Sequence, residues 1–306
     1  MKSKTTRALG IGSAALALSS LFTGELYKYT FCRDIGLFKL LPERKKHDEG
    51  YYALRDGTAQ RLREARCIRR SIVNADGQTL RGFYYPCGEK PGKKVVFIVH
   101  GYRSEHAETA GMYLNYYHSR GFDLFCCDHA GHGESDGKLI GWSVTESRDC
   151  LLWLDELETW LGSDIQVILH GFSMGGASVL KMSDRCGDAV KFIISDSGFS
   201  DFDRLAKKKI SGMYAPLRAI NCVVGGYDVR DADVRPNLSR SRKPILFVHG
   251  KLDPTVPFTM GQELFELYQG EKDCLFTDDA RHIETMYLHP REYMEKIDAF
   301  IERYIK

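Results

Sequence analysis

The chain has 306 residues and a mass of 34.8 kDa, with 43% hydrophobic and 27% charged residues. These fractions are ordinary for a folded globular protein and exclude disordered and fibrous classes. A formal net charge of +2 at pH 7 offers no broad electrostatic attraction to nucleic acid, so no nucleic-acid partner is expected.

The nine cysteines form no disulfide or metal-binding pattern. Their number is odd, no Cys-x-x-Cys occurs, and Cys126 and Cys127 are neighbours in one predicted strand. Adjacent strand residues point to opposite faces of a sheet, so these two would not form a disulfide. We therefore expect reduced thiols and no metal site.

The first predicted feature in chain order is a hydrophobic N-terminal segment. Residues 8–24 carry no charge and follow the basic residues 1–7, as in a signal peptide or membrane anchor. No Ala-x-Ala site follows, which favours an uncleaved anchor and a membrane-associated protein. The unpaired cysteines favour a cytoplasmic location instead. A third interpretation is an amphipathic helix on the body, with the contact continued by Leu26, Tyr27, Tyr29 and Phe31.

After this extension of residues 1–67, short apolar runs alternate with segments of helical periodicity. Runs at 68–73 and 80–86 flank a turn at 74–77 and predict a hairpin. The later runs lack polar alternation, as do strands of a parallel sheet that is covered on both faces. These runs are 94–100, 123–128, 165–170, 190–195, 244–249 and 273–277. The predicted helices are 105–120, 144–161, 174–185, 261–269 and 291–304.

Alternation of strands and helices predicts an α/β fold with a mostly parallel, doubly wound sheet over residues 68–306. Residues 199–231 are longer than one crossover helix requires, and their apolar residues recur at helical spacing. We interpret this stretch as a small helical cap over the carboxyl ends of the strands, where ligands bind in such sheets.

The strongest chemical motif is Gly-Phe-Ser-Met-Gly at residues 171–175. It joins a predicted strand to a predicted helix, and this context is typical of a nucleophile elbow. The glycines make room for a tight turn that exposes the Ser173 hydroxyl above the sheet. The backbone amide of Met174 is then a candidate oxyanion donor.

A serine needs a base and an orienting acid before it becomes a nucleophile. In this architecture the acid and then the histidine follow the serine in chain order. His282 follows the last predicted strand and is the expected base, whereas His289 precedes a proline at a helix start. Asp253, in the turn after 244–249, is the expected acid, and Asp196 is its main rival.

The second oxyanion donor should come from the loop after residues 94–100. There Gly101 allows the chain to turn so that the backbone amide of Tyr102 can face Ser173. Tyr102 and Met174 therefore complete the predicted catalytic set of Ser173, Asp253 and His282.

With these residues, the chain resembles the α/β-hydrolase superfamily, in the branch of small bacterial esterases and serine-aminopeptidase-like hydrolases. The resemblance covers residues 69–306. It is carried by His100-Gly101, the Asp-x-x-Gly-His-Gly-x-Ser element at 128–135, segments 170–176 and 250–253, and His282. It implies an α/β-hydrolase fold with a small cap and no cofactor. In this family the 128–135 element is usually a buried loop, so His129 and His132 are interpreted as structural rather than as metal ligands.

The leading hypothesis is a serine hydrolase that cleaves carboxylic esters of small, hydrophobic substrates. A peptidase or amidase could use the same triad, with Asp201 or Asp203 binding a free amino terminus, and so could an acyltransferase. A non-catalytic binding protein is disfavoured because nucleophile, acid and base are all present at compatible positions.

Overall fold

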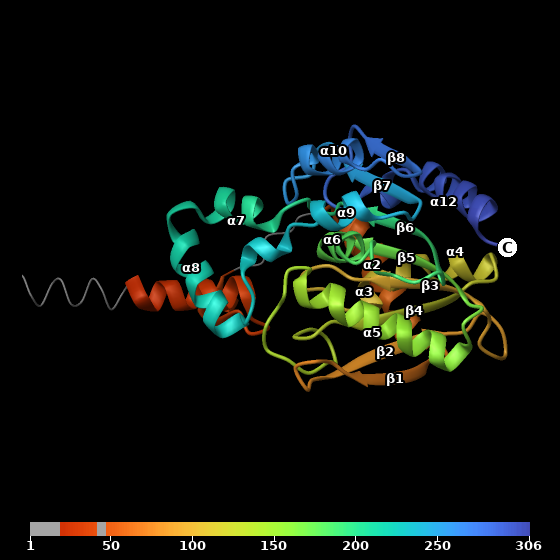
Figure 1. Cartoon of the computed structure of the whole chain (residues 1–306), viewed down its shortest axis with the longest axis horizontal. Coiled ribbons are helices and arrows are strands. Elements are labelled where there is room, and N and C mark those ends of the chain that lie inside the picture. The colour runs from red at the N-terminus through yellow and green to blue at the C-terminus, as the bar shows by residue number, and fades with distance from the viewer. Residues whose placement is uncertain (1–18, 42–46) are drawn as a thin grey trace, which may run out of the picture.

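An eight-stranded sheet runs through the centre of the protein in the computed structural model, which describes residues 19–41 and 47–306 (Figure 1). The strands lie in the order β1-β2-β4-β3-β5-β6-β7-β8. Only β1 with β2 and β2 with β4 pair in antiparallel fashion; the remaining pairs are parallel. The strands are β1 Ile68–Val73, β2 Thr79–Tyr85, β3 Lys94–Val99, β4 Asp123–Asp128, β5 Gln166–Phe172, β6 Val190–Asp196, β7 Ile245–Gly250 and β8 Lys272–Thr277. The predicted fold class and the predicted hairpin are confirmed.

Helices cover both faces of this sheet and so explain the continuous apolar runs. In β3, Val95, Phe97 and Val99 pack into one hydrophobic cluster, whereas Val96 and Ile98 pack into the other. Helices contributing to the first cluster include α5 (Val144–Leu161), α6 (Met174–Lys181), α9 (Arg235–Arg240) and α10 (Phe258–Leu267). The second cluster includes α2 (Glu49–Glu64), α3 (His106–Ala110), α4 (Leu114–Ser119), α11 (Thr285–Leu288) and α12 (Pro290–Tyr304).

The single helix expected at 105–120 is wrong: the structure divides it into α3, the short helix η2 (Gly111–Tyr113) and α4. Gly111 lies against helix α2, and a Cβ at this position would approach the Thr58 carbonyl carbon and oxygen to 2.7 Å. Close packing of the backbone against α2 therefore coincides with the break. Sequence periodicity carries no information about that contact.

Between β6 and β7 the chain leaves the sheet and forms a helical segment at one end of the molecule (Figure 1). Its elements are α7 (Phe202–Ile210), η3 (Ser211–Met213), α8 (Tyr214–Ile220), η4 (Asn221–Gly225) and η5 (Val229–Ala232), after which α9 lies over the sheet. This segment contains the stretch 199–231 that we interpret as a cap.

The N-terminal helix, residues 19–31, packs on this cap (Figure 1). Tyr27 and Phe31 are buried, the Phe31 ring meets Phe202 edge to face, and the Tyr27 hydroxyl lies 3.3 Å from Oδ1 of Asn221. For these residues the structure corresponds to the third interpretation of the N-terminus, a helix lying on the body.

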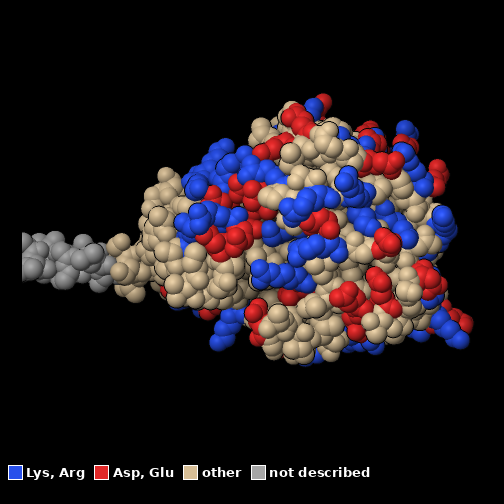
Figure 2. Space-filling model, in the orientation of Figure 1, with Lys and Arg blue, Asp and Glu red and all other residues tan. Residues whose placement is uncertain are grey.

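Most of the hydrophobic segment 8–24 lies outside the described residues, so membrane association through it stays a prediction. Within residues 19–41 and 47–306, none of the helices combines the length and the apolarity needed to cross a bilayer. On the face drawn in Figure 2, basic and acidic side chains are intermixed, and the end that carries the N-terminal helix is largely uncharged.

A buried carboxyl on α5 makes stability depend on pH. Burial raises the pKa of Asp149 to about 7, although the Asn74 amide lies within hydrogen-bonding distance. The unfolded chain releases this proton near pH 4, so the free energy of unfolding should fall as pH rises from about 4 to about 7. We expect Asp149→Asn to remove this loss, worth about 2–3 kcal/mol between pH 5 and pH 8.

Urea denaturation at pH 5 and pH 8 checks this expectation. Asp155→Asn, at an exposed position on the same helix, is the control and should alter stability little at either pH. An Asp149→Asn chain whose stability follows that of the parent at both pH values would contradict it.

Candidate active site

Ser173 lies in a tight turn between strand β5 and helix α6. Its backbone is strained, with φ of 53° and ψ of −115°. Residues other than glycine rarely adopt this conformation. Gly171 and Gly175 make the turn possible because a Cβ on either would come within 2.3 Å or 2.0 Å of a backbone oxygen. The serine hydroxyl is thus held at the carboxyl end of β5, in front of the N-terminus of α6.

The three residues of the predicted triad meet at this edge of the sheet. Ser173 Oγ lies 2.9 Å from Nε2 of His282, and Nδ1 of His282 lies 2.6 Å from Oδ2 of Asp253. His282 is in the loop after β8 and Asp253 in the turn after β7. With Asp253 ionised, His282 donates its Nδ1 proton to the carboxylate and leaves Nε2 free to accept the serine proton.

Both oxygens of the Asp253 carboxylate have hydrogen-bonding partners. Its Oδ1 accepts the backbone N–H groups of Thr255 at 2.7 Å and Val256 at 2.9 Å, and its Oδ2 lies 3.3 Å from Nε2 of His249. Burial alone raises the pKa of Asp253, but attraction to His282 and hydrogen bonds from His249 and His282 outweigh burial. The resulting pKa lies below the ordinary range of aspartate, so this carboxylate is ionised at neutral pH.

The other acids that lie near His282 in sequence or space have different partners. Asp196 accepts hydrogen bonds from the hydroxyls of Ser197 at 2.8 Å and Tyr293 at 2.9 Å, and burial raises its pKa to about 6. Asp278 pairs with Lys251, and Asp279 lies 2.6 Å from His289. The structure therefore brings Asp253, and not Asp196, to the imidazole.

Both predicted oxyanion donors belong to segments that border Ser173. Met174 is the first residue of α6, so its N–H has no acceptor within the helix and lies at the positive end of the helix dipole. A Cβ on Gly101 would lie 3.2 Å from Cβ of Ser173, so the loop after β3 passes directly beside the serine. Tyr102 follows in this loop.

Histidines 129 and 132 hold the loops behind this site. His129 donates its backbone N–H to Nε2 of His100 at 3.1 Å, and Nε2 of His132 accepts the backbone N–H of Arg103 at 3.2 Å. Burial lowers the pKa of all three imidazoles, so they are neutral at pH 7. They are suited to hydrogen bonding within the loops, as their structural interpretation requires.

Two groups of potential metal ligands occur among the described residues, and neither includes a member of the Ser173 cluster. One group is Cys127, His129 and Cys150, and the other is Glu105, His106 and Asp128. In the second group, the His106 backbone N–H already donates to Asp128 Oδ1 at 2.9 Å. We assign no metal to the candidate active site.

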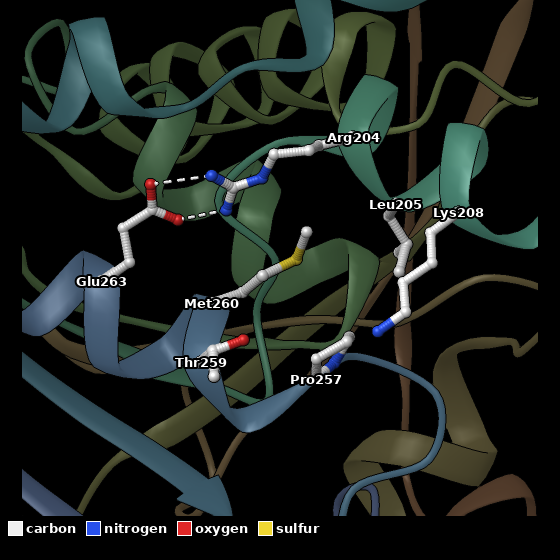
Figure 3. Close-up of a pocket in the computed structure, with 7 residues that line it drawn as sticks. All are labelled: Arg204, Leu205, Lys208, Pro257, Thr259, Met260 and Glu263. Atoms are coloured by element: carbon white, nitrogen blue, oxygen red, sulfur yellow. Dashed lines mark hydrogen bonds and ion pairs between the residues drawn. The ribbon is translucent and has the colours of Figure 1, made fainter.

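A cavity of about 350 Å³ lies between the cap helix α7 and helix α10 (Figure 3). Arg204 of α7 and Glu263 of α10 form an ion pair across it. Its lining residues are Arg204, Leu205, Lys208, Pro257, Thr259, Met260 and Glu263. No triad residue lines this cavity.

Sequence reasoning missed the contacts that the N-terminal helix makes beside the site. The Tyr102 hydroxyl donates to the Tyr29 carbonyl at 2.6 Å, and the Tyr102 ring stacks on Trp142. The aromatic residues at 27, 29 and 31 were the available indication, because they suggested contact with the body without identifying the partner.

Comparison with known proteins agrees with this architecture. Residues 90–217 match the family model of serine aminopeptidase, S33; this range includes Ser173 but neither Asp253 nor His282. An uncharacterized Bacillus subtilis protein, YqkD, is 24% identical over 240 residues, or 76% of this chain and 78% of YqkD. Mouse monoglyceride lipase is 37% identical over 120 residues, covering 37% of this chain and 38% of the lipase.

Among solved structures, the Pyrococcus furiosus esterase Pf2001 superposes with a TM-score of 0.65 at 19% identity. The superposition covers 87% of this chain and 99% of the esterase. At that identity the likeness concerns the fold, and it agrees with the sheet and helices described above. The chain therefore has the α/β-hydrolase fold and is similar, over residues 90–217, to the serine aminopeptidase family.

Proposed function

We propose that this hydrolase cleaves carboxylic esters of small, hydrophobic molecules through a catalytic triad of Ser173, His282 and Asp253, without a cofactor. The observation that carries the proposal is the continuous hydrogen-bonded chain from Ser173 Oγ through His282 to Asp253. Similarity to the serine aminopeptidase family over residues 90–217, to monoglyceride lipase over 120 residues and to an esterase in fold supports hydrolysis as the reaction type.

In the proposed mechanism, Ser173 Oγ attacks the ester carbonyl carbon while Nε2 of His282 takes the hydroxyl proton. The carbonyl oxygen becomes negatively charged, and the backbone amides of Met174 and Tyr102 stabilise it. The C–O bond to the alcohol then breaks, and His282 gives its proton to the leaving oxygen. Water repeats the attack on the acyl-enzyme, with His282 again as base, and releases the acid.

Two features favour esters over peptides with a free amino terminus. The acids considered for binding that terminus are already paired, Asp201 with Arg235 at 3.0 Å and Asp203 with Lys207 at 2.5 Å. An alkoxide is also a better leaving group than an amine. Aminopeptidase activity is the second candidate, and the match of residues 90–217 to the serine aminopeptidase model favours it.

Aromatic residues beside Tyr102 support the proposed preference for hydrophobic substrates. Trp142 stacks on Tyr102, with ring centroids 4.4 Å apart, and on Phe202 of the cap at 3.8 Å. An apolar aromatic cluster next to the loop of the candidate oxyanion donor favours an apolar acyl or aryl group.

Covalent labelling of the purified full chain tests the proposal. A fluorophosphonate should modify Ser173 alone, as mapped by peptide mass spectrometry, because only an activated serine attacks this probe at a useful rate. A panel of p-nitrophenyl esters of increasing acyl length should be hydrolysed faster than aminoacyl p-nitroanilides. The reverse preference would overturn the ester assignment, and labelling elsewhere would overturn Ser173.

Asp253→Asn should lower kcat for p-nitrophenyl acetate by about 10²–10⁴-fold, because an amide cannot hold the imidazole in the required tautomer. Steady-state kinetics of the folded variant measures this effect. Asp278→Asn is the matched control, since Asp278 is exposed and pairs only with Lys251 among the described contacts. Equal activity of both variants would remove Asp253 from the proposed triad.

A further inference from the structure

The loop that carries Tyr102 is bound to the end of the N-terminal helix. The last carbonyls of any helix lack intrahelical donors, and here the Arg103 guanidinium supplies them. It donates to the carbonyl oxygens of Tyr29 and Cys32, both at 2.8 Å, and lies 3.3 Å from that of Arg33. The positive charge also lies at the negative end of the helix dipole, which is the favourable arrangement.

Two further side chains bind the same helix end. The Tyr102 hydroxyl donates to the Tyr29 carbonyl at 2.6 Å and accepts a hydrogen bond from Nε of Arg103 at 2.7 Å. Trp142, which stacks on Tyr102, donates its Nε1 proton to the Thr30 carbonyl at 3.1 Å. The loop and the helix end are therefore joined by a network in which side-chain donors bind main-chain acceptors.

The loop conformation needs such support. Arg103 has a φ of 56°, in the left-handed region that is costly for a long side chain. Its backbone N–H donates to Nε2 of His132 at 3.2 Å. Tyr102 lies between this strained residue and Gly101, which borders Ser173.

We propose that Arg103 is a positioning residue. Its hydrogen bonds to the end of helix 19–31 hold the Tyr102 amide toward the oxyanion. The inference rests on the proposed function, in which that amide stabilises the transition state. If Arg103 has this role, activity depends on the N-terminal helix, because the loop would lose its support when the helix is not docked. The helix thereby controls the rate of the chemical step without touching substrate.

Kinetics of Arg103→Ala and Arg103→Lys in the full chain test the proposal. Lysine keeps the charge, but its compact ammonium cannot reproduce the planar fork of donors, so both variants should lose activity. Active sites are counted with a fluorophosphonate, so that unfolded protein does not enter the rate. We expect kcat per counted site to fall about 10- to 100-fold with KM changed less than twofold, since an oxyanion contact acts in the transition state.

Arg303→Ala is the matched control. Arg303 is an exposed residue of helix α12 and pairs with Glu271, just before strand β8. Its kcat and KM should equal those of the parent chain. An Arg103→Ala variant with unchanged kcat per counted site would overturn the positioning role while leaving the serine hydrolase intact. A parent chain that neither reacts with the probe nor hydrolyses esters would instead refute the proposed function.

Hydrogen exchange provides a readout that does not require activity. In Arg103→Ala, amides of residues 26–33 and 100–104 should exchange faster than in the parent chain, because each segment loses the other as a partner. In Arg303→Ala both segments should exchange as in the parent chain. Unchanged exchange in Arg103→Ala would contradict the docking of the helix by Arg103, whatever the kinetic result.

Discussion

Ser173→Ala is expected to reduce kcat for p-nitrophenyl acetate by at least about 10⁴-fold and to abolish fluorophosphonate labelling. In the proposed mechanism the change removes the oxygen that forms the acyl-enzyme, and the remaining oxyanion donors and binding contacts would sustain only a small residual rate over water. Initial rates with the purified variant measure the loss. Because His282 and Asp253 stay in place, the effect reports on the nucleophile and not on the fold.

Ser183→Ala is the control for this substitution. Its buried hydroxyl lies just after the end of helix α6 and donates to the Leu180 carbonyl at 2.7 Å. It makes no contact with the triad. Its kcat should remain within about twofold of the parent value, in keeping with loss of one peripheral hydrogen bond. Hydrolysis and labelling that persist in Ser173→Ala would show that another residue is the nucleophile.

Gly175→Ala is expected to destabilise the protein by at least about 3 kcal/mol, or to prevent folding. A Cβ at this position would lie 2.0 Å from the carbonyl oxygen of Val99 and 2.6 Å from that of His100. Helix α6 would have to move away from strand β3, carrying Ser173 and Met174 away from His282. Urea denaturation, with soluble yield as a second readout, measures the effect.

Gly57→Ala tests whether the loss is specific to that contact. Gly57 lies within helix α2, and a Cβ there would meet nothing within 4 Å. Alanine is the better helix former, so this variant should be neutral or up to about 1 kcal/mol more stable. Equal stability of Gly175→Ala and the parent chain would contradict the close approach of α6 to β3.

Much of the sheet could be predicted because the pattern that marks a strand is contained in a few neighbouring residues. Strand β4 matches the predicted run at 123–128, and helix α5 matches the prediction at 144–161. A run of residues buried on both faces, or an apolar stripe at helical spacing, is a property of a few neighbouring residues. The elbow at Ser173 is local for the same reason, since the glycines at 171 and 175 provide the room that its turn needs.

Contacts between distant residues depended on the packed structure. Sequence order left both Asp196 and Asp253 as candidates, and only the pairing of β6, β7 and β8 decides which carboxylate reaches His282. The helix predicted at 105–120 is divided at Gly111, where α2, some fifty residues earlier in the chain, packs closely against the backbone.

The sequence by itself therefore determined the strands, helices α5, α6, α10 and α12, the tight turn at Ser173 and a short set of candidate partners. Only the tertiary structure decided which of those partners meet, and that the N-terminal helix is bound by Arg103 beside the candidate oxyanion site. The physical reason is that a hydrogen bond between side chains or loops far apart in the chain depends on how whole layers pack. Local patterns of hydrophobicity and turn residues do not encode that arrangement in a form that can be read from one sequence.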